Sequence, residues 1–168
     1  NTAIGASFTG VRCAVGTSGG GFALMVEGLS LAGITESALV VFLSQRPGPA
    51  TGMPTWTEQG DLLFAVHAGH GEFPKIILAP GDIEEMVELT AHAYNLADIY
   101  QTPVIVLSDM LLSESHRDIS RSTLQKIESS YQVNRGKYIL EADASYERYA
   151  WSDDGISPRL QPGYSGVY

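Results

Sequence analysis

Val11-Arg12-Cys13-Ala14-Val15, followed by Gly16-Thr17-Ser18-Gly19-Gly20-Gly21, is the stretch of sequence that decides the fold. Residues 11–15 are apolar apart from Arg12, which predicts a short buried strand, and the glycines predict a turn. Residues 22–29 then follow a helical pattern. A strand that passes through a glycine turn into a helix is the first unit of an alternating α/β fold.

The same alternation continues along the chain. Apolar runs rich in β-branched residues predict strands at residues 38–43, 75–79 and 103–107. Helical patterns fill residues 57–66 and 82–101, and Asp82 with Glu85 forms the signature of a capping box. We therefore expect an α/β fold with a doubly wound, mostly parallel sheet and helices on both faces.

Length and charge bound the organisation and the partners. With 168 residues and 44% hydrophobic residues, the chain is expected to form a single domain over residues 1–168, with a looser C-terminal segment at 113–168 packing on it. The net charge of −9 argues against a nucleic-acid partner. No apolar run is long enough for a membrane span, which argues against a membrane partner.

The chain start and the cysteine usage give two further expectations. Asn1 stands where a Met would be expected, and residues 2–8 resemble the later part of a helix, so we expect the N-terminus to be truncated. Cys13 is the single cysteine and has no partner for an internal disulfide. A reducing, cytoplasmic location is therefore expected.

Candidate functional residues follow the predicted strands, because ligands in such folds bind at the carboxyl ends of parallel strands. Arg46 follows one strand and precedes Pro47-Gly48-Pro49, which stiffens the backbone beside it. Its guanidinium could grip a carboxylate through two parallel hydrogen bonds, or it could be an ordinary surface arginine.

The glycine turn itself allows several interpretations. It could bring backbone close to a ligand or simply form a tight turn, and it matches neither common nucleotide-binding fingerprint. It also satisfies G-x-S-x-G, with Ser18 as the nucleophile of a serine hydrolase and Asp109 and His116 as its acid and base. His67, His70 and Glu72 hint at a metal, but a loop pair without a third ligand at defined spacing is more typical of structural polar residues, and no metal site is predicted.

Taken together, the motifs resemble the alpha subunit of 2-oxoacid:ferredoxin oxidoreductases over nearly the whole chain. The segments that carry the resemblance are Ala3–Ser7, Gly16–Phe22, Gln45–Gly52, Pro54-Thr55 with Glu58–Leu62, His70–Glu72, Leu107–Asp109, Arg148-Tyr149 and Asp154–Arg159. Two positions depart from common patterns: Gly20 stands where related thiamine enzymes often have proline, and Ala50 where serine is frequent.

The resemblance implies an enzyme that uses thiamine diphosphate for oxidative decarboxylation of a 2-oxoacid to an acyl-CoA, with reduction of ferredoxin. This chain would be its pyrimidine-binding domain. The residues implied to line the cofactor's aminopyrimidine pocket are Thr17, Ser18, Gly19, Gly20 and Phe22. Arg46 would bind the carboxylate of the 2-oxoacid, and 2-oxoglutarate or a branched-chain oxoacid is favoured over pyruvate.

The same resemblance implies a shared active site. A beta subunit would bind the diphosphate half of the cofactor with magnesium, and [4Fe-4S] clusters would lie on partner subunits because the chain has no cysteine cluster. The activating glutamate and a substrate loop are expected upstream of Asn1, so the fragment alone should be inactive. Two alternatives to this enzyme remain open: the serine hydrolase and a non-catalytic scaffold subunit.

Overall fold

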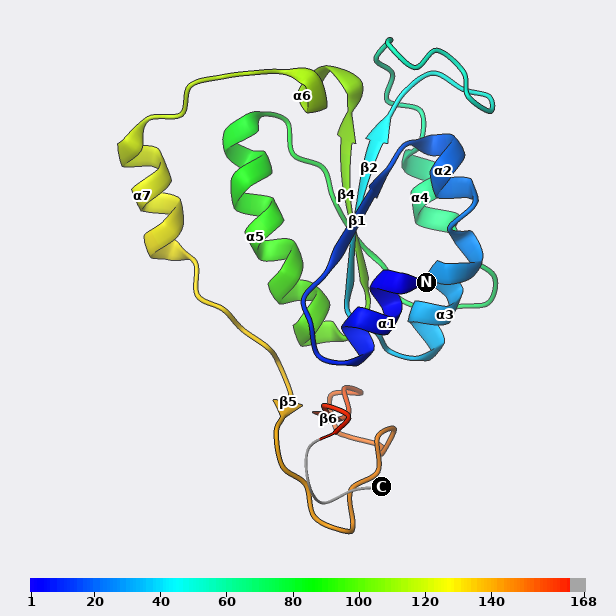
Figure 1. The fold of residues 1–168 in the computed structure, drawn as a ribbon, viewed down its shortest axis with the longest axis vertical. Coiled ribbons are helices and arrows are strands. Elements are labelled where there is room, and N and C mark those ends of the chain that lie inside the picture. The colour runs from blue at the N-terminus through cyan, green and yellow to red at the C-terminus, as the bar shows by residue number, and fades with distance from the viewer. Residues whose placement is uncertain (164–168) are drawn as a thin grey trace.

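A parallel sheet forms the centre of the computed structural model, which describes residues 1–163 (Figure 1). Its four strands lie in the order β1-β2-β4-β3, and every neighbouring pair is parallel. The strand bounds are β1 Ala14–Thr17, β2 Leu39–Gln45, β3 Ile76–Leu78 and β4 Pro103–Asp109. The predicted parallel α/β class is thereby confirmed.

Helices cover both faces of this sheet, with α1 to α4 on one side and α5 on the other (Figure 1). The helix bounds are α1 Thr2–Phe8, α2 Gly19–Ala23, α3 Val26–Ile34, α4 Leu62–His67, α5 Ile83–Tyr100, α6 Met110–Glu114 and α7 Arg121–Ser130. Asp82 caps α5 as predicted and accepts from the Glu85 backbone N–H at 2.9 Å, whereas the Glu85 side chain accepts from the N–H of Gly81, one residue before the N-cap, at 2.8 Å.

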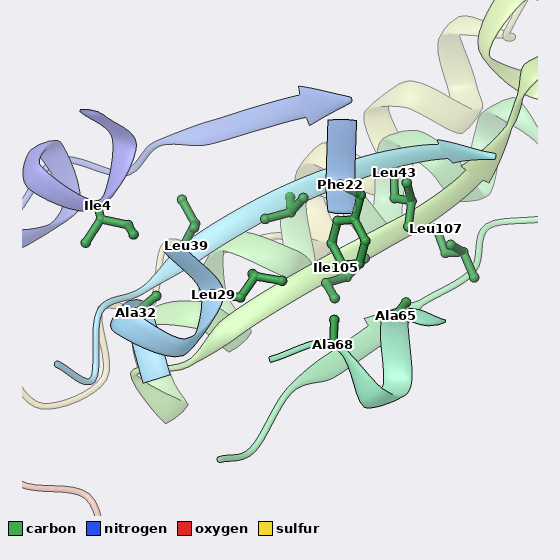
Figure 2. Close-up of a cluster of buried hydrophobic side chains, with 11 residues drawn as sticks. Ile4, Phe22, Leu29, Ala32, Leu39, Leu43, Ala65, Ala68, Ile105 and Leu107 are labelled. Atoms are coloured by element: carbon green, nitrogen blue, oxygen red, sulfur yellow. The ribbon is translucent and has the colours of Figure 1, made fainter. Parts of the chain in front are cut away.

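A separate apolar cluster fills each face of the sheet. On the side of α1 to α4, Phe22 and Leu29 pack against Ile105 of β4 (Figure 2). On the other side, Val104 and Val106 pack against the small Ala93 and Ala97 of α5, which let that helix approach the sheet closely. Each fully buried side chain of Leu, Ile, Val or Phe size contributes roughly 1.5–3 kcal/mol, so these clusters hold the carboxyl ends of the strands in register.

Three predicted boundaries were wrong. The helix predicted for residues 22–29 is divided between α2 and α3, because the Leu24 and Met25 N–H groups bond three residues back instead of four. The helix predicted for 57–66 begins only at Leu62, since the Asp61 N–H bonds to the Gln45 side chain. The first strand is shifted toward the C-terminus, because Arg12 turns into a polar network with Asp98 of α5.

Beyond α7, the described part of the chain reaches the opposite end of the sheet from the loop that follows β2, whereas α7 itself lies beside α5 (Figure 1). The contacts of the part beyond α7 are polar: Arg135 donates to the Gly10 carbonyl, and Arg148 pairs with Glu36 at 2.9 Å. A small parallel sheet of β5 Tyr138–Ile139 and β6 Arg159–Leu160 completes it as far as the structure describes. The division at 113–168 stays a prediction, and residues 164–168 lie outside the described residues.

No helix within residues 1–163 is both long enough and apolar enough to cross a membrane.

Candidate functional site

The predicted site residues meet at the carboxyl edge of the sheet. Thr17 ends β1, and Ser18 is the N-cap of α2, while Arg46 directly follows β2. The loop after β2 folds back over the glycine turn, so that the Ala50 carbonyl oxygen lies 3.0 Å from where a Cβ of Gly20 would stand. Two segments far apart in the sequence therefore form one surface at this edge.

The glycines of the turn are explained by contacts within this chain. A Cβ on Gly19 would lie 2.8 Å from Asp61 Oδ2, and one on Gly21 would overlap Thr17 Oγ1. The side-chain faces of these glycines are thus occupied by the protein itself. Ser18 is at the N-cap position of α2, but its side chain makes no capping hydrogen bond. What the turn can offer a ligand is its backbone and the Ser18 hydroxyl.

Phe22 lies behind the turn. It is 0% exposed and packs edge-to-face against Phe64 of α4, with ring centroids 5.2 Å apart. Its side chain therefore anchors the turn in the core. Of the residues predicted to line the pyrimidine pocket, Phe22 can act on a ligand only through the position of the turn.

Arg46 sits in an ordered loop with its guanidinium unpaired. The Met53 N–H donates to the Pro47 carbonyl at 3.0 Å, which closes the loop on itself. Within the described part of the chain, Arg46 makes no ion pair, and its buried Nε has no hydrogen-bond partner. A buried donor without an acceptor is costly and uncommon in a native structure, so Arg46 is set up to receive an anionic or polar group.

Asp61 and Gln45 are site residues to which the sequence assigned no role. Gln45 is 4% exposed and ends β2; its Oε1 accepts from the Asp61 N–H at 2.9 Å. The Asp61 Oδ2 atom is buried without a hydrogen-bond partner among the described residues. Burial raises the pKa of the Asp61 carboxyl, and the charge of Glu58 raises it further. Two features of the sequence could have pointed to these residues: Gln45 is a polar residue at the end of an apolar strand, and Asp61 is an acidic residue before an apolar helix.

The residues of the alternative serine hydrolase do not come together. Asp109 accepts hydrogen bonds from the Leu112 N–H at 2.8 Å and from Gln59 Nε2 at 2.7 Å. Burial alone would raise the pKa of Asp109, but these hydrogen bonds outweigh it and lower the pKa. His116 and Asp109 line a cavity of about 500 Å³ to which Ser18 does not contribute. No hydrogen bond among residues 1–163 joins Ser18 to His116, so this geometry lacks a nucleophile–base pair.

The histidines whose pattern hinted at a metal site also lie apart in the structure. His67 ends α4, while His70 and Glu72 line a cavity beside α3. In the portion of the chain that the structure describes, no group of three or more His, Cys, Asp or Glu side chains is arranged to hold a metal ion.

The carboxyl edge can therefore accept a ligand that has both an anionic group and a hydrogen-bond donor. Arg46 offers an unpaired N–H, and Asp61 offers an unpaired carboxylate oxygen. The turn between them is held against the loop without side chains at Gly19 and Gly20. These features fit thiamine diphosphate, whose aminopyrimidine ring carries a donor, together with a substrate that has a carboxylate.

Comparisons with known proteins bear on this site. The family described as pyruvate flavodoxin/ferredoxin oxidoreductase, thiamine diP-bdg, matches residues 1–156. The chain is 48% identical over its whole length to subunit alpha of 2-oxoacid:ferredoxin oxidoreductase 1 from Sulfurisphaera tokodaii, of which it covers 26%. It is 43% identical over 138 residues, 82% of its length, to 2-oxoglutarate synthase subunit KorA from Archaeoglobus fulgidus, of which it covers 39%.

A solved structure is similar over almost the entire chain. It is 2-oxoglutarate:ferredoxin oxidoreductase from Magnetococcus marinus with 2-oxoglutarate, coenzyme A and succinyl-CoA bound. The two superpose with a TM-score of 0.86 at 36% identity, covering 99% of this chain and 28% of that one. The chain thus spans about a quarter of the length of the Sulfurisphaera tokodaii subunit and of that solved structure. It belongs to the thiamine diphosphate-binding family of pyruvate flavodoxin/ferredoxin oxidoreductases, as the resemblance of its motifs implied.

Proposed function

We propose that this chain is the pyrimidine-binding part of a 2-oxoacid:ferredoxin oxidoreductase, which converts a 2-oxoacid and coenzyme A to an acyl-CoA, carbon dioxide and reduced ferredoxin. The observation that carries the proposal is Arg46, whose buried guanidinium nitrogen has no partner within the described residues. A 2-oxoacid brings the carboxylate that this arginine lacks. Relatives named for 2-oxoglutarate support that oxoacid as the first substrate to test.

The roles of the side chains follow from their positions. Thiamine diphosphate, when bound, supplies the nucleophilic carbon and the electron sink needed to break the bond between the 2-oxo carbon and the carboxylate. Arg46 holds the substrate carboxylate in the orientation required for its loss. Thr17, Ser18, Gly19 and Gly20 form the wall beside the aminopyrimidine ring, and Phe22 keeps that wall in place from the core.

The active site is shared with other chains in this proposal. The turn has no phosphate-binding motif, so a beta subunit binds the diphosphate and its magnesium, and partner subunits carry the [4Fe-4S] clusters that pass electrons to ferredoxin. The helices nearest the turn expose apolar side chains that fit burial against such a partner, namely Leu24, Leu62, Leu63 and Val66. The free thiol of Cys13 supports a reducing compartment, and the cytoplasm is the location we propose.

The test is dye reduction by the complete enzyme. The full subunit that contains this chain is assembled with its partners, and reduction of a viologen dye is followed with 2-oxoglutarate, coenzyme A and thiamine diphosphate. We expect reduction that requires each of the three. A loaded, assembled complex that reduces no dye with 2-oxoglutarate, pyruvate or a branched-chain oxoacid would overturn the proposal.

A non-catalytic scaffold predicts a different result. In that case, changes at Thr17 or Ser18 would alter assembly and leave cofactor affinity untouched. Titrating thiamine diphosphate into assembled complexes with Ser18→Ala therefore separates the two functions. Weaker binding of thiamine diphosphate together with normal assembly would support the enzymatic function.

A further inference from the structure

Asp61 carries a carboxylate that no contact within residues 1–163 uses. It occupies the N-cap position of α4, yet its side chain makes no capping hydrogen bond. Three other polar N-caps, Asp82, Asp109 and Ser120, each accept from a backbone N–H in the first turn of their helix, whereas Asn1 and Ser18, like Asp61, do not. Asp61 also pairs with no Lys, Arg or His among these residues. Helix capping and ion pairing therefore do not explain it.

Gln45 fixes the position of Asp61. The Gln45 side chain donates to the Ser108 carbonyl at 3.2 Å and accepts from the Asp61 N–H at 2.9 Å, so it ties the start of α4 to the ends of β2 and β4. Gln45 immediately precedes Arg46. The backbone of Asp61 is thus held at the edge of the sheet from which Arg46 also projects, which is the geometry of a prepared site.

The Asp61 carboxylate lies over the first glycine of the turn. Its Oδ2 and Oδ1 atoms would be 2.8 and 3.2 Å from a Cβ on Gly19. Oδ2 is shielded from solvent and has no hydrogen-bond donor within the described residues. A buried acceptor left without a donor costs about 1–3 kcal/mol, and more if it is charged, so a ligand that supplies the donor gains that energy on binding.

The charge of Asp61 selects the kind of group that it can meet. The diphosphate of the cofactor and the carboxylate of an oxoacid are both anionic and would be repelled by a carboxylate. The aminopyrimidine ring is neutral and carries an exocyclic amino group that donates hydrogen bonds. We propose that Asp61 Oδ2 accepts a hydrogen bond from this amino group, and that Asp61 thereby determines recognition of the ring at the glycine turn. This inference rests on the proposed function.

The experiment compares two cofactors on the complete, assembled enzyme. One is thiamine diphosphate, and the other is oxythiamine diphosphate, in which an oxo group replaces the exocyclic amino group. Equilibrium dissociation constants are measured by calorimetry for the wild type, Asp61→Ala and Asp61→Asn. Asp82→Ala serves as the matched control, because Asp82 caps α5 and does not line the turn.

Wild-type enzyme should prefer thiamine diphosphate over the oxo analogue by about 10-fold or more, the ratio expected for one hydrogen bond to a charged group. Asp61→Ala should lose most of this preference, because the substitution should weaken the binding of thiamine diphosphate and leave the binding of the oxo analogue unchanged. Asp61→Asn keeps one acceptor oxygen without the charge, so its preference should fall between the two. Asp82→Ala should keep the wild-type preference.

Unchanged preferences in both Asp61 variants would overturn the role of Asp61 while leaving the proposed function intact. If Asp61→Ala fails to assemble, Asp61→Asn decides: a preference equal to that of the wild type removes Asp61 from the site. If the wild-type enzyme does not bind thiamine diphosphate, the proposed function is overturned, and so is the role of Asp61.

Discussion

Gly52 shows how a single residue shapes the surroundings of Arg46. Its φ of 58° lies in the left-handed region, and a Cβ there would overlap the Pro47 carbonyl that accepts from the Met53 N–H. Gly52→Ala should therefore destabilise the protein by about 2 kcal/mol or more and loosen the loop that carries Arg46. Denaturant unfolding measures the loss in free energy.

Gly60→Ala is the control for this change, because the nearest atom to its Cβ, in Glu58, would be at an ordinary 3.6 Å. Its free energy of unfolding should stay within about 0.5 kcal/mol of the wild type. Equal stability of the two variants would mean that the loop tolerates a side chain at Gly52, and that Arg46 is held by something else.

Some residues of the candidate site could be predicted from the sequence, and others could not. Arg46 could be named because a charge beside a stiff Pro-Gly-Pro segment is visible in one stretch of sequence. Asp61 could not, because an Asp before an apolar helix predicts an ordinary N-cap, and only the fold brings it over Gly19. The burial of Phe22 depends likewise on Phe64 of α4, which comes much later in the chain. Long-range packing decided what local pattern could not.

At the scale of elements, α6 begins with a cap that responds to pH. Burial by itself would raise the pKa of Asp109, but hydrogen bonds from the Leu112 N–H and from Gln59 lower the pKa overall. A lowered pKa means that Asp109 stabilises the fold above the pKa of its unfolded form, and that this contribution is lost as the pH falls through the folded-state pKa. Asp109→Ala should cost about 1 kcal/mol at neutral pH.

The pH dependence can be isolated with Asp109→Asn, because Asn caps helices about as well as Asp and does not titrate. The stability gap between wild type and Asp109→Ala should shrink in acid, whereas Asp109→Asn should lack that acid-dependent part. Thermal unfolding across a pH series measures both. A gap for Asp109→Ala that stays constant into acid would show that the charge of Asp109 contributes nothing.

The sequence predicted which elements exist better than where they end. The parallel strands, the alternation with helices and the Asp82 cap of α5 were all predicted correctly, since each has a local signature. The break between α2 and α3 was missed, because the apolar pattern runs through Leu24 and Met25 without interruption. The late start of α4 depends on Gln45, a partner from another element.

At the scale of the whole molecule, the two ends of the sheet have different tasks. The C-terminal segment is attached at one end by the ion pairs of Arg135 with the buried Asp98 and of Arg148 with Glu36. The carboxyl edge at the other end keeps Arg46 and Asp61 unpaired within residues 1–163. Ion-paired arginines at one end, and Arg46 and Asp61 without an ion pair at the other, fit the shared half-site that we propose.

The oxoacid dependence of dye reduction tests this account most directly. In the complete enzyme, Arg46→Ala should raise the KM for the 2-oxoacid by roughly 30-fold or more, because a buried carboxylate–arginine contact contributes about 2–4 kcal/mol. Arg121→Ala, which alters an exposed arginine on α7, should leave the KM unchanged. If Arg46→Ala shows the same oxoacid dependence as Arg121→Ala, then Arg46 does not bind the substrate and the assignment of the site is wrong.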